Sequence, residues 1–138
     1  MYSIEELKTR YEAETYQVIG AAMEVHRQLG CGFLEAVYGD ALAFEFKEKN
    51  ISFEREKKID IYYKGEKLEH YYQADFLCFD HIVVELKAVS ELVKSHDSQV
   101  LNYLNAKGYE VGLLFNFGEV SLKYHRLFNA RNNNLYNP

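Results

Sequence analysis

Two charged residues, Glu85 and Lys87, stand two positions apart at the end of an apolar stretch that begins Ile82-Val83-Val84. In a β-strand, residues two apart share a face, so this carboxylate and amine point the same way. On a half-exposed strand they would form an ordinary surface ion pair. On an interior strand, two charges cost free energy unless they are paired or hold a metal. The apolar neighbours favour an interior strand, in which the two charges are either paired or hold a metal ion.

Asp75 lies on the preceding predicted strand, and the hairpin register decides whether its carboxylate reaches the same face. A strict two-residue turn at Asp80-His81 places Asp75 opposite Leu86, on the wrong face. One more loop residue, or a bulge, pairs Asp75 with Glu85 instead. We predict the second register, and carboxylates on opposite faces would contradict the metal site.

The elements that would position these residues follow from the spacing of apolar side chains. Helices are predicted at 3–29, at 34–49 with Val37, Ala41 and Phe44 on its apolar face, and at 91–107. Strands are predicted at 53–63, 67–73, 74–79, 82–87, 110–117 and 121–128. The segments between 53 and 87 are expected to form three or four strands. The order α-α-β-β-β-β-α-β-β predicts an α/β fold, a mixed sheet flanked by helices, with the 91–107 helix in a right-handed crossover.

Length and composition limit the alternatives. With 138 residues, 48% of them hydrophobic, we expect a single domain over 1–138, ending in a frayed, asparagine-rich tail at 129–138. No apolar run approaches the roughly 20 residues of a membrane span, and the N-terminus lacks a secretory pattern. Cys31 and Cys78 lie outside any C-x-x-C pattern, so we expect reduced thiols, a cytoplasmic location and no membrane contact. No phosphate-loop pattern is present, so no nucleotide cofactor is expected.

Several motifs together resemble a known family. Asp75, Glu85-Leu86-Lys87 and a following helix with Gln99 resemble the PD-(D/E)XK nuclease core, with Ala74 where the name has proline. The segment from Gly32 to Tyr38, GFLEAVY, is similar to the motif of the bacterial GxxExxY proteins, a branch of that superfamily. Further similar segments are Val25-His26 with Leu29-Gly30, Gln99 with Asn102-Tyr103-Leu104, and 112–118. The resemblance covers roughly residues 14–128 and implies a restriction-endonuclease-like core.

The resemblance also implies a metal site. Asp75 and Glu85 would hold Mg²⁺ or Mn²⁺, which prefer carboxylate oxygens and retain several waters, and the Leu86 backbone carbonyl would be a third ligand. Glu35 would complete the shell directly or through water. From the residues alone, the preferred interpretation of Glu35 is a carboxylate that only suits the first turn of a helix.

Two further residues receive catalytic roles from the resemblance. Lys87 would orient the attacking water or neutralise charge growing on the phosphate. Gln99 would hydrogen-bond the water, the phosphate or Lys87, although a simple tie between helix and sheet explains it equally well. Tyr38 and Tyr103 are expected to be core aromatics with a hydroxyl partner.

The predicted function is metal-dependent hydrolysis of DNA or RNA by a metal-activated water. The formal net charge of -5 counts against it, because proteins that grip nucleic acid usually carry a basic face. Local lysines such as Lys94 and Lys123, a homodimer or a protein partner would have to supply the grip. The alternative is a non-catalytic binding or assembly module that keeps the nuclease fold. A small-molecule phosphoesterase is a third reading, with no residue in its favour.

Overall fold

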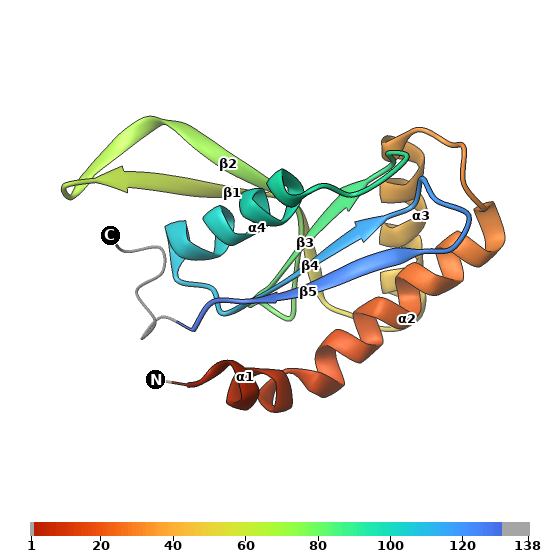
Figure 1. Ribbon diagram of the computed structural model, residues 1–138, viewed down its shortest axis with the longest axis horizontal. Helices are drawn as coiled ribbons and strands as arrows, with labels where there is room; N and C mark the ends of the chain where they lie inside the picture. Colours follow the sequence, from red (N-terminus) through yellow and green to blue (C-terminus); the bar gives the residue numbers. More distant parts are fainter. Residues whose placement is uncertain (1, 131–138) are drawn as a thin grey trace.

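A five-stranded mixed β-sheet forms the centre of the protein, seen in a computed structural model that describes residues 2–130 (Figure 1). In chain order the elements are α1 (Ile4–Arg10), α2 (Glu12–Leu29), α3 (Glu35–Glu48), β1 (Phe53–Tyr63), β2 (Glu66–Cys78), β3 (Ile82–Lys87), α4 (Lys94–Lys107), β4 (Val111–Asn116) and β5 (Lys123–Phe128). The sheet order is β1-β2-β3-β4-β5, with β3 and β4 parallel and the other neighbours antiparallel. The predicted fold class, a mixed sheet flanked by helices, is confirmed.

Helices cover both faces of the sheet. α2 and α3 pack on one face, where Tyr38, Leu42 and Phe46 join the larger apolar cluster, and α4 packs on the other through Val100 and Leu104. This explains why every residue of β4 is buried, since a strand covered on both faces has no side exposed to solvent. Among the described residues, no helix combines the length and apolarity needed to cross a membrane.

The predicted helix 3–29 is in fact two helices that meet at Tyr11. Ser3 begins α1 with a capping box, in which its side chain and that of Glu6 each accept a backbone N–H. Tyr11 is buried, and its hydroxyl donates a hydrogen bond of 2.7 Å to Glu110, just before β4. The periodicity of apolar residues over 3–29 is uninterrupted and cannot predict this break, because the hydrogen-bond partner of Tyr11 lies 99 residues further along the chain.

The predicted strands 67–73 and 74–79 are one strand, β2, so three strands and not four lie between α3 and α4. No turn residue separates the two halves. Lys64 and Gly65, with φ values of 50° and 81°, form the expected tight turn between β1 and β2. The resulting long hairpin projects past α4 at one end of the molecule (Figure 1).

The frayed tail predicted for 129–138 is wrong for its first two residues. Asn129 and Ala130 are both 4% exposed, and the Asn129 N–H donates to the Glu110 carbonyl at 2.9 Å. Residues 131–138 lie outside the described part of the chain.

Candidate active site

The β2–β3 hairpin has the register that the metal site requires. Cys78 pairs with Ile82, and the ladder runs up to Phe76 opposite Val84, which carries Asp75 opposite Glu85. The turn explains this register. Phe79 and Asp80 both have positive φ, the His81 N–H donates to the Cys78 carbonyl at 3.1 Å, and His81 remains as the extra residue. The strict two-residue register is excluded.

Beyond Phe76 the two strands separate, and carboxylates take the place of backbone partners. The Leu86 N–H donates to Asp75 Oδ2 at 2.7 Å, and the Asp75 N–H donates to Glu85 Oε1 at 3.2 Å. The strands of the hairpin are thus joined at this point by the two acidic side chains themselves. The contacts bring both carboxyl groups to one place, as predicted.

These two carboxyl groups form a buried, interacting pair. Burial and the charge of Asp75 raise the pKa of Glu85 to about 8. Burial also raises the pKa of Asp75, although the hydrogen bond from Leu86 opposes the shift. A side-chain hydrogen bond between the two groups further raises the pKa of Glu85 and lowers that of Asp75. Two carboxyl groups placed this way share a proton or bind a cation in its place.

Lys87 lies on the same face of β3 as Glu85, toward α4, while Leu86 packs in the opposite layer. Its positive charge lowers the pKa of Asp75, Glu85 and Glu35, so its ammonium lies within electrostatic reach of all three. A surface ion pair does not describe this arrangement. Glu85 is only 6% exposed, and no ion pair within residues 2–130 includes Lys87.

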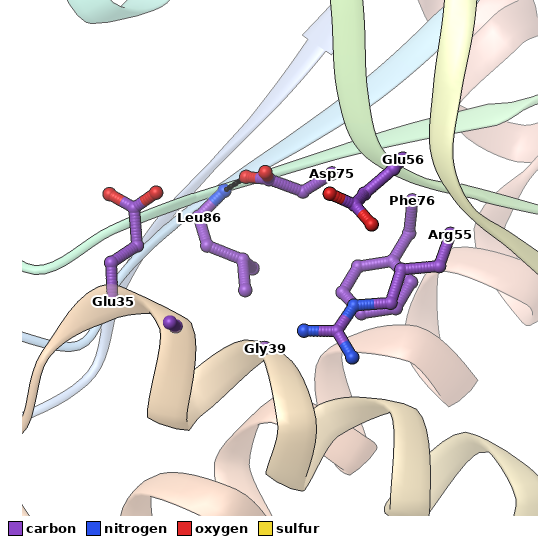
Figure 2. A pocket seen from close by; sticks show the side chains of 8 residues that line it. Glu35, Gly39, Arg55, Glu56, Asp75, Phe76 and Leu86 are labelled. Carbon is purple, nitrogen blue, oxygen red and sulfur yellow. Dashed lines mark hydrogen bonds between the residues drawn. The ribbon is translucent and has the colours of Figure 1, made fainter.

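Glu35 reaches the site from α3, of which it is the first residue. It borders a cavity of about 200 Å³ whose wall also includes Asp75 and Leu86 (Figure 2). Although the Glu35 side chain is exposed, partial desolvation beside the cavity and the charge of Asp75 raise its pKa. Glu35 therefore lies within electrostatic reach of Asp75. Direct or water-mediated contact with a metal stays a prediction.

Gln99 lies one turn before Tyr103 on α4, so both are on the side of the helix that faces the sheet. Burial and the charges of Glu85 and Asp75 raise the pKa of Tyr103, which places this side of α4 over the carboxyl pair. Gln99 is partly buried, and no hydrogen bond joins its side chain to residues 2–130. Within the described residues, the side chain of Gln99 therefore makes no hydrogen bond to the sheet, and its catalytic role stays a prediction.

Tyr38, the last residue of the GFLEAVY segment, is a core aromatic with hydroxyl partners, as expected. Its hydroxyl donates to the Gly30 carbonyl and accepts the Phe33 N–H, and its ring stacks on Phe117 at 4.6 Å. Tyr38 therefore fixes the loop that leads into α3 and positions Glu35. Its role is structural.

Three residues beside the site carry no signal that sequence reasoning recognised. Arg55 and Glu56 of β1 border the same cavity as Asp75, although they look like ordinary alternating charges in the sequence. Asn116 is fully buried at the end of β4. Its amide oxygen accepts the Val89 and Gly118 N–H groups, and its nitrogen donates to the Val89 carbonyl, which joins the loops after β3 and β4.

The donor set suits a hard divalent cation. Residues alternate along a strand, and the Lys87 carbonyl faces β4, where it accepts the Phe117 N–H at 2.9 Å. The Leu86 carbonyl therefore lies on the opposite side with its own N–H, toward Asp75. Within residues 2–130, no three His, Cys, Asp or Glu side chains are arranged to hold a metal ion. Two carboxyl groups and one carbonyl are the kind of small oxygen set with which Mg²⁺ retains several waters.

Comparisons with known proteins identify the superfamily and support the fold. The family model for the PD-(D/E)XK nuclease superfamily matches residues 12–127, a range that includes every site residue described above. A crystal structure of SSO0001 is similar in fold, with a TM-score of 0.57 and 19% sequence identity over 88% of this chain. This chain spans 60% of that protein. No curated protein is significantly similar in sequence to this chain.

Proposed function

Because this chain belongs to the PD-(D/E)XK nuclease superfamily, we propose that it hydrolyses phosphodiester bonds of DNA or RNA with the help of a divalent metal ion. One observation carries the proposal: the buried Asp75–Glu85 carboxyl pair at the point where the hairpin separates, with Lys87 in electrostatic reach. The GFLEAVY segment supports the finer assignment to the GxxExxY branch, because Tyr38 and Glu35 each have a defined place near this site.

The residues would divide the work as follows. Asp75, Glu85 and the Leu86 carbonyl would hold Mg²⁺ or Mn²⁺, and such an ion lowers the pKa of a bound water and stabilises charge on a phosphate. Lys87 orients the attacking water or neutralises the charge that grows on the phosphate oxygens. Glu35, which borders the same cavity as Asp75, would complete the ligands of the ion directly or through a water.

Gln99 would act as a hydrogen-bonding residue, since its side chain has no hydrogen-bond partner among residues 2–130. Its amide, above the carboxyl pair on α4, donates to the phosphate or to the attacking water. The deep burial of Glu85 keeps bulk water away from its carboxyl group and strengthens the local electrostatic interactions.

The test is a cleavage assay on single- and double-stranded DNA and RNA with Mg²⁺ or Mn²⁺. Glu85→Ala and Lys87→Ala are each expected to lower the rate at least about a hundredfold, since each removes electrostatic stabilisation of the transition state. Glu48→Ala and Lys47→Ala on α3, both exposed, are matched controls and are expected to retain full activity. If Glu85→Ala and Lys87→Ala each cleave as fast as the wild type, the assignment of the site is rejected.

A second candidate is a non-catalytic binding or assembly module, and the net charge of -5 favours it. The two functions differ in their response to metal. A nuclease site that binds Mn²⁺ in the folded state raises the melting temperature as the Mn²⁺ concentration rises, and Glu85→Ala removes the effect. A melting temperature that does not respond to millimolar Mn²⁺, in a protein that cleaves none of the four substrates, would establish the module instead.

A further inference from the structure

Arg55 is the one cationic residue that borders the cavity beside Asp75, among the residues that the structure describes. The other charged groups there are the carboxylates of Glu35, Glu56 and Asp75. Figure 2 shows the Arg55 side chain extending from β1 toward Gly39, on the opposite side of the cavity from Asp75. The Arg55 charge lowers the pKa of Asp75, so the two groups interact across this space.

Two side chains hold the guanidinium in place, and a glycine leaves room for it. Asp40 accepts an ion-pair contact at 2.9 Å, and the Phe76 ring lies beneath it with the Arg55 Cζ 5.6 Å from the ring centre. Gly39 supplies the necessary space, because a Cβ there would lie 2.8 Å from Arg55 Nη2. The contact with Asp40 involves one guanidinium nitrogen, which leaves most of the five N–H donors for another acceptor.

The backbone of β1 is distorted where it directs Arg55 into the cavity. Consecutive strand residues normally point to opposite faces, yet Arg55 and Glu56 both border this cavity. Glu56 has φ of 55°, and the ladder pairs Arg55 with Phe76 and Lys57 with Ala74 but omits the position between them. A non-glycine residue with this φ is strained, and such strain is typical of functional sites.

We propose that Arg55 binds a backbone phosphate next to the scissile one, so that the cavity is a phosphate subsite of the nuclease centre. The inference rests on the proposed function. A guanidinium presents parallel N–H donors that match two phosphate oxygens. The exposed ion pair with Asp40 contributes little to stability, so its main effect is to orient the guanidinium. This subsite provides a local cationic contact in a chain with an acidic overall charge.

The test measures binding separately from cleavage. In a Lys87→Ala background, which keeps the metal ligands, fluorescence anisotropy follows labelled DNA and RNA oligonucleotides in the presence of Mn²⁺. Arg55→Gln is expected to weaken binding about tenfold or more and to reduce the slope of log affinity against log salt by about 1. Arg27→Gln is the matched control, since Arg27 is also ion-paired to a carboxylate but lies on the exposed side of α2.

A second pair of variants, one test and one control, examines the position of Arg55 without removing its charge. Gly39→Ala pushes the guanidinium aside and is expected to weaken binding severalfold, with the melting temperature almost unchanged because the displaced group is the end of a flexible side chain. Gly20→Ala on α2, where a Cβ meets nothing within 4 Å, is the control and leaves binding unchanged. A neutral methylphosphonate at the contacted linkage should weaken binding by the parent protein but not by Arg55→Gln.

The outcomes separate the two proposals. If Arg55→Gln weakens binding no more than Arg27→Gln, or leaves the salt slope unchanged, Arg55 binds no phosphate. The same conclusion follows if the Lys87→Ala protein, which carries Arg55, binds none of the oligonucleotides at low salt. If binding depends on Arg55 while wild-type cleavage survives Glu85→Ala and Lys87→Ala, the catalytic assignment fails and the phosphate subsite stands.

Discussion

Glu85 is a carboxyl group that holds a proton at neutral pH unless a cation replaces it. Its pKa of about 8 has two causes in the structure: burial in the sheet, and the Asp75 carboxylate beside it. In the unfolded chain neither cause remains, and the pKa returns to about 4.5. The difference links the stability of the metal-free protein to pH.

The direction of the pH effect follows from the raised pKa. Stabilisation by the Glu85 proton is fully present below about pH 4.5 and is lost as the pH rises to about 8. In EDTA, the melting temperature of Glu85→Gln minus that of the wild type should therefore increase as the pH rises through this window. Glu48→Gln, at an exposed position, should not show this gain. A constant difference between Glu85→Gln and the wild type from pH 5 to pH 8 would contradict the raised pKa.

At the scale of the elements, α4 must lie close to β4 for Gln99 and Tyr103 to sit above the carboxyl pair. Gly112 in β4 makes this approach possible. A Cβ at that position would lie 2.7 Å from Val100 Cγ1 and 3.3 Å from Leu104 Cδ2. The distance between the helix and the strand is thus set by the absence of a side chain.

Gly112→Ala is expected to lower the free energy of unfolding by about 1–3 kcal/mol, because α4 must shift or repack. The shift would also move Gln99 away from the site and lower kcat, even near neutral pH and with saturating metal. Denaturant unfolding and the cleavage assay measure the two effects. Gly20→Ala, in open space within a helix, should instead raise stability slightly. Equal effects of the two alanines would contradict this packing.

The β2–β3 hairpin and α3 differ in how far the sequence predicts them. The spacing of the apolar residues left two hairpin registers open, and the register that a metal site requires is the one observed, with Cys78 opposite Ile82. The apolar face of α3 was predicted through Phe44, which is 63% exposed, whereas Tyr38, Leu42 and Phe46 are buried. Two faces of this helix are apolar, so periodicity alone could not choose between them.

Arg55 was missed for a related reason. A regular alternating strand assigns Arg55 and Glu56 to opposite faces, and only the positive φ of Glu56 brings both to one cavity. Glutamate carries no local signal for that conformation, unlike the Lys64-Gly65 turn. Asn116 is similar, since its partners lie in two loops far apart in the sequence.

At the scale of the whole molecule, the acidic charge and the proposed substrate oppose each other. The chain has a formal net charge of -5, and three of its carboxylates border the cavity close to the reaction centre. A divalent cation on Asp75 and Glu85 would reverse the local sign, while the rest of the surface still repels phosphates. Binding of nucleic acid should therefore depend on metal.

In EDTA at moderate salt, we expect anisotropy to detect little binding of an oligonucleotide by Lys87→Ala, and Mn²⁺ to strengthen this binding at least about tenfold. The local change of charge is the physical reason. Asp75→Asn in the same background should lose most of the gain. Equal affinity with and without Mn²⁺ would show that the metal plays no part in holding the substrate.

The hydrogen bond from Leu86 to Asp75 also bears on how a lineage of such proteins can lose its activity. Removing Asp75 leaves a strand N–H without its acceptor and weakens the hairpin. Replacing Glu85 by glutamine relieves a buried acid and favours folding at neutral pH. Glutamine also keeps an oxygen that can accept the Asp75 N–H. Inactive descendants are thus expected to change Glu85 to glutamine before they change Asp75, so a relative with this pair of residues is expected to have lost its activity.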